Sequence, residues 1–174
     1  GFMNTSLPTP IDLLIEARWI IPVEPFDTVL ENHAVAIDKG EIVAILQQRE
    51  VSSRFAPRQT RALDHHILIP GLVNLHTHAA MTLLRGLADD LPLMTWLEQH
   101  IWPAEAKHLS PGFVHDGSLL ACAEMLRGGV TCFNDMYFYP GAVAKAALAT
   151  GIRAAIGLIA IDFPTPYGND VDDY

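Results

Sequence analysis

Two histidines separated by a single residue, His76 and His78, follow an apolar stretch of the chain. Successive side chains of an extended strand point to opposite faces, so both imidazoles are expected on one side of a strand end. Two neutral imidazoles in that arrangement can bind one transition metal ion. The motif alone has low specificity, because hydrogen bonds can also satisfy two histidines at a strand end. Catalytic zinc normally has three protein ligands and a water molecule, so the pair predicts only part of a metal site.

Strands and helices alternate in the region that must position these histidines. Apolar strands are predicted over residues 67–75, 130–134 and 152–161, and helices over residues 110–127 and 141–150. Wholly apolar strands in this alternation indicate a parallel sheet built from right-handed βαβ units. Barrel enzymes with such strands carry their active sites at the carboxyl ends, where the two histidines are expected.

Serine, proline and glycine residues set the expected limits of the helices. Ser110 followed by Pro111 is a strong helix start, because the hydroxyl can cap the first turn and proline suits the first helical position. That helix is expected to end at a pair of glycines. Shorter helices are predicted over residues 80–87 and 92–102, and Pro103 is expected to interrupt the second of them.

The first part of the chain, residues 1–66, predicts a small β-module. Two short apolar strands are expected within residues 11–21. Segments 33–37 and 41–45 are joined by a glycine-containing turn and are expected to form a hairpin. Residues 47–61 are polar and are expected to form a connector or a short helix.

The composition is typical of a globular protein of the cytoplasm. Of the 174 residues, 50% are hydrophobic and 18% are charged, which argues against a disordered chain. The formal net charge of −9, without a cluster of lysine or arginine, argues against nucleic-acid binding. No apolar stretch is long enough to span a membrane. The cysteines, Cys122 and Cys132, form no CxxC motif and are expected to be reduced, small core residues.

Six segments, in order along the chain, together resemble a known enzyme family. They are Pro70–His78, Met81–Gly86, Asp90–Leu93, Trp96–Leu97, Ile101–Glu105 and Gly129–Phe138. The family is the amidohydrolase superfamily, and the chain is similar to the branch that contains 5-methylthioadenosine/S-adenosylhomocysteine deaminases and triazine hydrolases. The resemblance covers nearly the whole chain. It is specific to this branch and much less specific to one substrate.

The resemblance implies an α/β fold with two parts. Residues 67–174 would form the N-terminal part of a (β/α)8 TIM barrel, truncated after about three strands, beside a small flanking β-sandwich formed by residues 1–66. His76 and His78 would be metal ligands on the first barrel strand. In the family, the remaining ligands and the general acid/base lie on later strands, which would follow Tyr174. We therefore expect no catalytic acid or base within this chain, and the chain alone is expected to be inactive.

The resemblance also implies two substrate-binding residues, Glu105 and Trp96. Glu105 matches a glutamate that binds the ribose hydroxyls in adenosine-type deaminases, and a carboxylate can accept two hydrogen bonds from a vicinal diol. Trp96 matches a residue that lines the nucleoside pocket. Glutamate after a helix is more often a solvated surface group, and an aromatic residue on a helix more often belongs to the core. Both alternatives stay open at this point.

The predicted function is metal-dependent hydrolytic deamination of the purine ring of 5-methylthioadenosine, S-adenosylhomocysteine or a related adenosine. Zn²⁺ is the expected cofactor, and iron or manganese also suits histidine and aspartate ligands. Alternatives are a triazine-type chlorohydrolase or aminohydrolase, a guanine or cytosine deaminase, and a non-catalytic metal-binding fragment. The expected partner is a small nucleoside substrate, without nucleic acid or membrane, and the family implies a homo-oligomer.

Other polar residues have weaker functional interpretations. Asn134 and Asp135, at the end of the second strand, could line a pocket or cap the following turn. Arg85 could steer an anionic group, although a structural salt bridge is the favoured interpretation. The remaining histidines are expected to have no metal-binding role, and they are His33, His65, His66, His100, His108 and His115.

Overall fold

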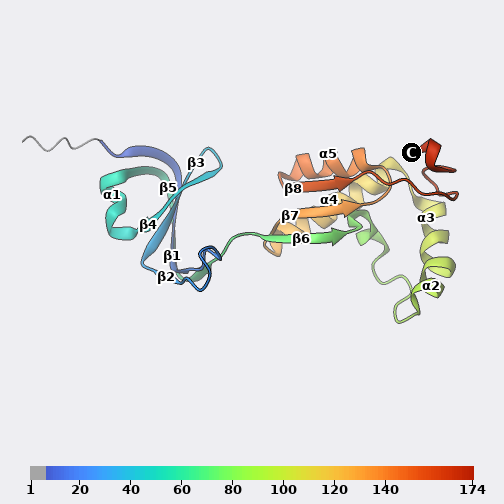
Figure 1. Ribbon diagram of the computed structural model, residues 1–174, viewed down its shortest axis with the longest axis horizontal. Coiled ribbons are helices and arrows are strands. Elements are labelled where there is room, and N and C mark those ends of the chain that lie inside the picture. The colour runs from blue at the N-terminus through green and yellow to red at the C-terminus, as the bar shows by residue number, and fades with distance from the viewer. Residues whose placement is uncertain (1–6) are drawn as a thin grey trace, which may run out of the picture. The chain divides into compact units, whose positions relative to one another are not determined.

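The computed structural model describes residues 7–174, which form two compact units (Figure 1). The first unit extends to Pro70 and the second runs from Gly71 to Tyr174. Residues 1–6 of the predicted β-module lie outside the described residues. None of the helices within residues 7–174 combines the length and the apolar character that crossing a membrane requires.

The first unit is one five-stranded sheet in which β1 (Thr9–Ile20) pairs with three other strands. Its partners are β2 (Leu30–Glu31) and β3 (His33–Asp38), both antiparallel, and β5 (Phe55–Leu68), which is parallel. β3 continues into β4 (Glu41–Gln47) as an antiparallel hairpin, which confirms the hairpin predicted from the sequence.

The turn between β3 and β4 has the backbone conformation that tight hairpins favour. Lys39 has a φ of 51° and Gly40 has a φ of 79°. Two consecutive residues with positive φ match the right-handed twist of the flanking strands, and glycine adopts this conformation without a steric penalty. The backbone amide of Lys39 also donates a hydrogen bond of 2.9 Å to the carboxylate of Asp12 on β1.

Strand β1 corrects the prediction of two separate short strands within residues 11–21. It is one continuous strand with a register shift between Ala17 and Trp19, where it pairs with β5. The shift is a bulge, which lets a strand bend without ending. Two apolar runs separated by Glu16 and Arg18 therefore belong to one element.

The segment of residues 47–61, predicted as a connector or a short helix, is helical only in its first part. The short helices η1 (Gln48–Glu50) and α1 (Val51–Arg54) are followed directly by β5. Most side chains of β5 are exposed, so its sequence lacks the alternation of apolar and polar residues that usually predicts a strand. Backbone pairing with β1 forms the strand. Ile67, expected to open the barrel strand, lies in β5 and pairs with Trp19.

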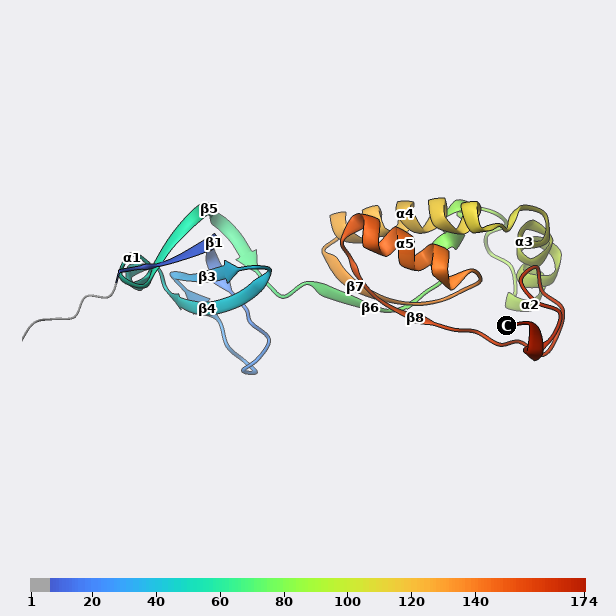
Figure 2. The ribbon, with the colours of Figure 1, turned by 90° about the horizontal axis from the view of Figure 1, so that it is seen from above.

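The second unit contains a three-stranded parallel sheet in the order β6 (Leu72–Thr77), β7 (Val130–Met136) and β8 (Arg153–Gly157). The parallel pairing confirms the predicted βαβ arrangement. Helices α4 (Pro111–Arg127) and α5 (Pro140–Thr150) connect the strands and lie on one face of the sheet (Figure 2).

Helix α4 begins and ends as the sequence predicts. The Ser110 hydroxyl oxygen accepts a hydrogen bond of 3.1 Å from the backbone amide of Phe113, and Pro111 occupies the first turn. The helix ends before Gly128.

Strand β8, in contrast, ends at Gly157 and not at residue 161, because its partner β7 ends at Met136, the residue opposite Gly157.

The segment between β6 and α4 departs from the predicted helices. Residues 79–84 form a 3₁₀ helix, η2 (Ala79–Leu84). A longer helical stretch follows, composed of α2 (Leu93–Trp96), the π turn η3 (Leu97–Ile101) and α3 (Trp102–His108). Pro103 does not interrupt it, and this proline lies at the start of α3, which directly follows the π turn η3.

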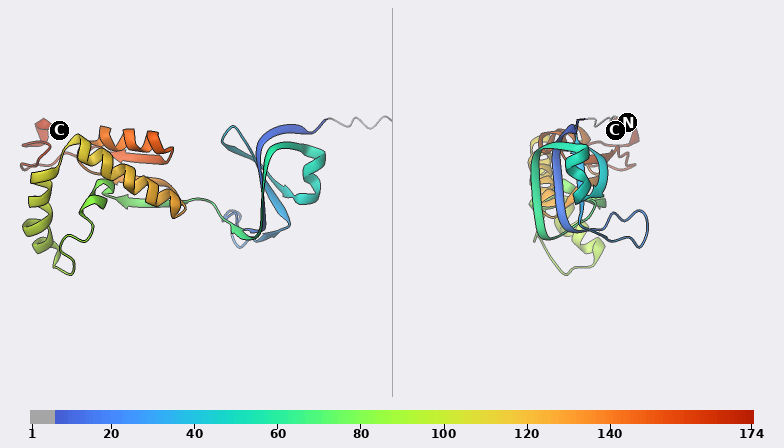
Figure 3. Two further views of the ribbon diagram at one scale, coloured as in Figure 1. Left: turned by 180° about the vertical axis from the view of Figure 1, so that it is seen from behind. Right: turned by 90° about the vertical axis from the view of Figure 1, so that its left-hand side faces the viewer.

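The core of the second unit lies where α4, α5, β7 and η2 meet (Figure 3). Gly117 of α4 is in close contact with η2, since a Cβ atom at this position would lie 2.5 Å from the carbonyl oxygen of Ala80. Ala79 and Ala80 are both buried there. The small side chains therefore allow the backbone that directly follows His78 to pack closely against the helix layer.

Candidate functional site

His76 and His78 lie side by side at the carboxyl end of β6. Their ring centroids are 4.9 Å apart and the rings are nearly perpendicular. Nδ1 of His78 is 2.6 Å from the carbonyl oxygen of Met136, at the end of β7. A carbonyl oxygen can only accept, so Nδ1 carries the proton and Nε2 has a free electron pair. This tautomer is the one that a metal ligand bound through Nε2 requires.

The histidine pair is not part of a complete metal site within residues 7–174. No group of three or more histidine, cysteine, aspartate or glutamate side chains in these residues could hold a metal ion. The described residues thus offer two imidazoles and no third ligand.

Asp135 on β7 contacts the residues on both sides of the second histidine. Its Oδ1 accepts hydrogen bonds from the Thr77 hydroxyl, at 2.8 Å, and from the backbone amide of Ala79, at 2.7 Å. The side chain is fully buried, and burial raises the pKa of Asp135, although these hydrogen bonds oppose the rise. Asp135 therefore contacts the segment around His78, and the turn that follows β7 is not its hydrogen-bond partner.

Glu105 is a buried carboxylate on α3. Only 6% of the residue is exposed, and its Oε1 accepts a hydrogen bond of 2.5 Å from the hydroxyl of Tyr137. Burial raises the pKa of Glu105, while the Tyr137 hydrogen bond and the nearby His78 lower it. The pKa of Tyr137 is also raised, first by burial and then by its carboxylate partner. Glu105 is thus not the solvated surface group that its position after a helix could suggest.

One cavity of about 330 Å³ brings together three of the four predicted site residues. His78, Trp96 and Glu105 line it, and Tyr137 lies beside them in its wall. The Trp96 indole nitrogen donates to the carbonyl oxygen of Leu87 at 3.4 Å, which leaves the ring as part of the wall. The other lining residues are apolar, and they are Met81, Leu93, Leu97, Ile101, Trp102, Met136, Phe138, Ile159 and Ile161. His76 is not among the lining residues.

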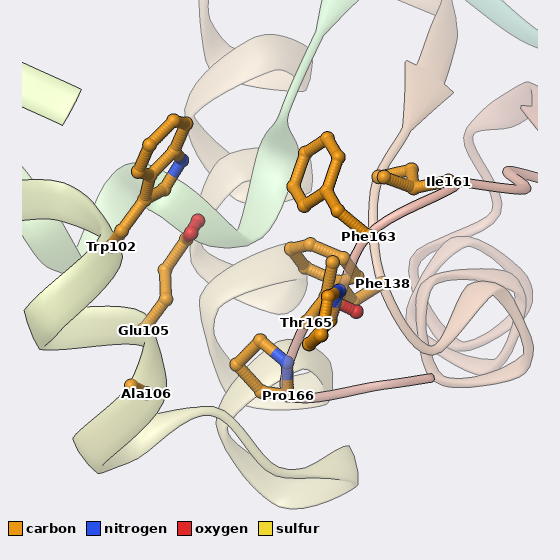
Figure 4. Close-up of a pocket in the computed structure, with 9 residues that line it drawn as sticks. Trp102, Glu105, Ala106, Phe138, Ile161, Phe163, Thr165 and Pro166 are labelled. Atoms are coloured by element: carbon orange, nitrogen blue, oxygen red, sulfur yellow. The ribbon is translucent and has the colours of Figure 1, made fainter. Parts of the chain in front are cut away.

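A second cavity, of about 590 Å³, also has Glu105 in its wall (Figure 4). Residues of α3 lie on one side of it, facing Phe138, Ile161 and Phe163 on the other side. The carboxylate of Glu105 is therefore accessible from two hollows of the second unit.

Of two further residues in this region, Tyr137 was not singled out by sequence reasoning, and Asp135 was only a weaker candidate for lining a pocket or capping a turn. Both lie within Gly129–Phe138, one of the segments that carry the family resemblance, which was the available signal. Their partners, Thr77 and Glu105, come from segments far away in the sequence. Only the pairing of β6 with β7 and the position of α3 reveal these contacts.

Several of the remaining polar residues have structural partners. Arg85 forms two hydrogen bonds with the carboxylate of Glu124, at 3.0 and 2.6 Å, as the favoured interpretation predicts. Nδ1 of His33 lies 2.7 Å from the carbonyl oxygen of Glu31, and Nδ1 of His115 lies 3.2 Å from Asp116. The cysteines, Cys122 and Cys132, are free; the first is buried and the second half-buried.

Comparison with known proteins gives one family and several close relatives. A family model described as the amidohydrolase family matches residues 67–173. A 5-methylthioadenosine/S-adenosylhomocysteine deaminase of Saccharophagus degradans is 51% identical over 166 residues, covering 95% of this chain and 37% of the relative. The chain therefore spans little more than a third of the length of that relative.

Two solved structures with a similar fold contain zinc. An adenosine deaminase from Xanthomonas campestris with bound zinc matches with a TM-score of 0.92 and 54% identity, over 95% of this chain and 38% of that one. An atrazine chlorohydrolase from Arthrobacter aurescens in complex with zinc matches with a TM-score of 0.75 and 23% identity, over 87% and 36% of the chains. At that identity, the second match shows a common fold only.

Proposed function

The chain belongs to the amidohydrolase family, and we propose that it is the N-terminal part of a metal-dependent hydrolytic deaminase of adenosine-type nucleosides. The proposed substrates are 5-methylthioadenosine, S-adenosylhomocysteine or a related adenosine. The relative with this printed activity is 51% identical to the chain. The observation that carries the proposal is the buried carboxylate of Glu105 in the same cavity as His78.

His76 and His78 are the proposed metal ligands within this chain. The protonated Nδ1 of His78 holds the ring by its hydrogen bond to the Met136 carbonyl, and Asp135 binds the Thr77 hydroxyl and the Ala79 amide on either side of the ring. Zinc suits imidazole ligands, and both solved structures described above contain it, while iron or manganese also fits. When bound, the ion lowers the pKa of a water molecule towards neutrality.

Glu105 is proposed to bind the ribose of the substrate. Tyr137 occupies Oε1, and within the described residues no hydrogen bond occupies Oε2. A carboxylate accepts hydrogen bonds from two neighbouring hydroxyls, and such charge-assisted bonds are stronger than neutral ones. Trp96 would form an apolar wall against the base. Together these side chains hold the purine on the side of the cavity where His78 lies.

The rest of the enzyme is proposed to lie outside this chain. Strands β6, β7 and β8 would be the first three strands of a (β/α)8 barrel, with the five-stranded sheet as a flanking β-sandwich module. The general acid/base and the remaining metal ligands would come from later strands, so the chain alone would be inactive. We also propose a homo-oligomer, as the family resemblance implies, and a location in the cytoplasm.

The experiment uses protein that extends over the length of its relatives. It is supplied with zinc and given 5-methylthioadenosine, S-adenosylhomocysteine and atrazine, while ammonia and chloride are measured. We expect ammonia from the nucleosides and no chloride from the triazine. Release of chloride without ammonia would instead assign the triazine hydrolase activity, and no product from any substrate would favour a non-catalytic metal-binding protein.

The variant Glu105→Gln tests the role of the carboxylate. It should raise KM for the nucleosides by roughly tenfold or more, because hydrogen bonds to a charged group contribute about 1.5–3 kcal/mol. A heteroaromatic amine without ribose should be unaffected. Equal effects on both kinds of substrate would contradict ribose binding by Glu105.

A further inference from the structure

The end of β6 that carries the two histidines is irregular. Leu75 and His76 lie between two residues of β6 that are paired with β7. Only one residue of β7, Asn134, lies between the two corresponding partners. Two residues opposite one define a β-bulge, which interrupts the ladder of backbone hydrogen bonds and leaves backbone groups in need of other partners. His76, one of the proposed metal ligands, is therefore a bulged residue.

Side-chain amides bind the backbone groups of this bulge. Nδ2 of Asn134 donates a hydrogen bond of 3.0 Å to the carbonyl oxygen of Leu75. Oδ1 of Asn74 accepts a hydrogen bond of 3.3 Å from the backbone amide of His76. The asparagine side chain suits both tasks, because it carries an acceptor oxygen and a donor nitrogen. The bulge therefore has one specific partner on each of the two strands.

Asn134 contacts the residues on both sides of His76. Its side chain binds the carbonyl oxygen of the preceding residue, Leu75. Its backbone carbonyl oxygen accepts a hydrogen bond of 2.8 Å from the hydroxyl of the following residue, Thr77. Asp135, the next residue of β7, contacts the residues on both sides of the second histidine in a similar way. Successive residues of β7 thus flank the two proposed ligands of β6.

The two histidines differ in what holds their rings. Nδ1 of His78 is bound to the carbonyl oxygen of Met136. Within residues 7–174, the ring of His76 has no such hydrogen bond, and it contacts the ring of His78 edge to face. The direction of the His76 ring therefore depends on the backbone of the bulge, which Asn134 and Asn74 hold.

We propose that Asn134 is a positioning residue, which directs His76 towards the metal by holding the carbonyl group of Leu75. The inference rests on the proposed function, because it takes His76 to be a metal ligand. Metal–ligand distances vary by only about 0.2 Å, so a small shift of the backbone at the bulge weakens metal binding. Asn134 is exposed, so loss of its amide should change folding stability little.

The test makes the same chemical change, asparagine to aspartate, at both partners of the bulge. Asn134→Asp removes the donor to the Leu75 carbonyl, whereas Asn74→Asp keeps an acceptor for the His76 amide. Both variants add one negative charge near the histidines, so the comparison isolates the loss of the donor. In protein that extends over the length of its relatives, zinc affinity is measured by competition with a chelator. Asn134→Asp should bind zinc roughly tenfold or more weakly than Asn74→Asp.

Two further measurements distinguish positioning from a structural role. The visible absorption of bound Co²⁺ depends on ligand geometry, and it should shift in Asn134→Asp but not in Asn74→Asp. The metal-free Asn134→Asp protein should unfold at nearly the same temperature as the unchanged protein. A fall in unfolding temperature that accounts for the loss of zinc would overturn the positioning role.

Two alanine variants complete the comparison. Asn134→Ala removes the donor without adding charge, and it should also weaken zinc binding and shift the Co²⁺ absorption. Asn169→Ala is the matched control, because Asn169 is exposed and its Nδ2 donates a hydrogen bond of 2.7 Å to Asp173, on the segment after β8. This variant should change neither zinc affinity nor the Co²⁺ absorption.

The outcomes separate the positioning role from the proposed function. Equal losses in the two aspartate variants would assign the effect to charge and overturn the positioning role. Unchanged zinc affinity in Asn134→Ala would overturn it too, while the deaminase function stands. Failure of both Asn134 variants to fold would assign the residue to the fold and not to the metal site. If the unchanged protein neither binds zinc nor releases ammonia, the proposed function itself fails.

Discussion

The two units of the chain differ in whether they bury polar side chains. In the first unit the core is apolar, and every polar or charged residue described there is at least partly exposed. The second unit buries Glu105, Ser118 and Asp135, and it contains the cavities described above. Burying a carboxylate costs free energy that hydrogen bonds only partly offset. Side chains retained at that cost are more readily explained by function than by folding.

Replacing His78 should have the largest effect among the changes that test this difference between the two units. In protein that extends over the length of its relatives, His78→Ala should lower zinc affinity and deamination by well over 100-fold. Changes that only disturb the surroundings of a ligand already cost about 10–100-fold, and this one removes a ligand. Zinc content and ammonia release are the measurements.

The matched control for that variant lies in the first unit. His66→Ala removes an exposed imidazole from β5 and should change neither zinc content nor activity. Equal losses in both variants would show that the second unit has no special part in metal binding. Retention of zinc by His78→Ala would remove the histidine from the ligand set.

The two units also differ in how far the sequence predicts them. Helix α4 follows from Ser110 and Pro111, and the parallel sheet follows from the apolar segments, because in both cases a local signal coincides with the tertiary structure. Strand β5 carries no such signal. It is polar and exposed, and it exists because its backbone pairs with β1.

Within the site, the same distinction separates the predicted residues from those that were missed or only weakly indicated. Glu105 and Trp96 were singled out by resemblance, and the structure places both in the cavity of His78. Tyr137 and Asp135 act through partners about thirty to sixty residues away, which sequence spacing does not reveal. Their contacts depend on strand register and on the position of α3.

Tyr137→Phe examines a smaller contribution to the same site. The variant removes the donor to Glu105 while keeping the ring, so substrate binding changes only through the position of the carboxylate. KM for nucleosides should therefore rise about two- to tenfold with kcat nearly unchanged. Steady-state kinetics with 5-methylthioadenosine provide the measurement.

A positioning role for Tyr137 requires that its effect depend on Glu105. In the double variant with Glu105→Gln, the effect of Tyr137→Phe should largely disappear, as expected for two groups in contact. Tyr139→Phe, a neighbouring tyrosine that does not line the smaller cavity, serves as the control. Additive effects of the two changes would contradict positioning of the carboxylate by Tyr137.

Leu14→Ala should have the smallest effect on function and a large effect on stability. Leu14 is buried in the apolar core of the first unit, and truncation of a buried leucine typically costs about 2–5 kcal/mol of folding free energy.

Val114→Ala makes a cavity in the core that contains Ala79 and Ala80, next to His78. Thermal unfolding and zinc affinity are measured for both variants. The contrast between the units predicts that zinc affinity falls only in Val114→Ala, since only that core supports the backbone at the site. A comparable fall in Leu14→Ala would mean that the first unit also shapes the metal site, despite its lack of buried polar groups.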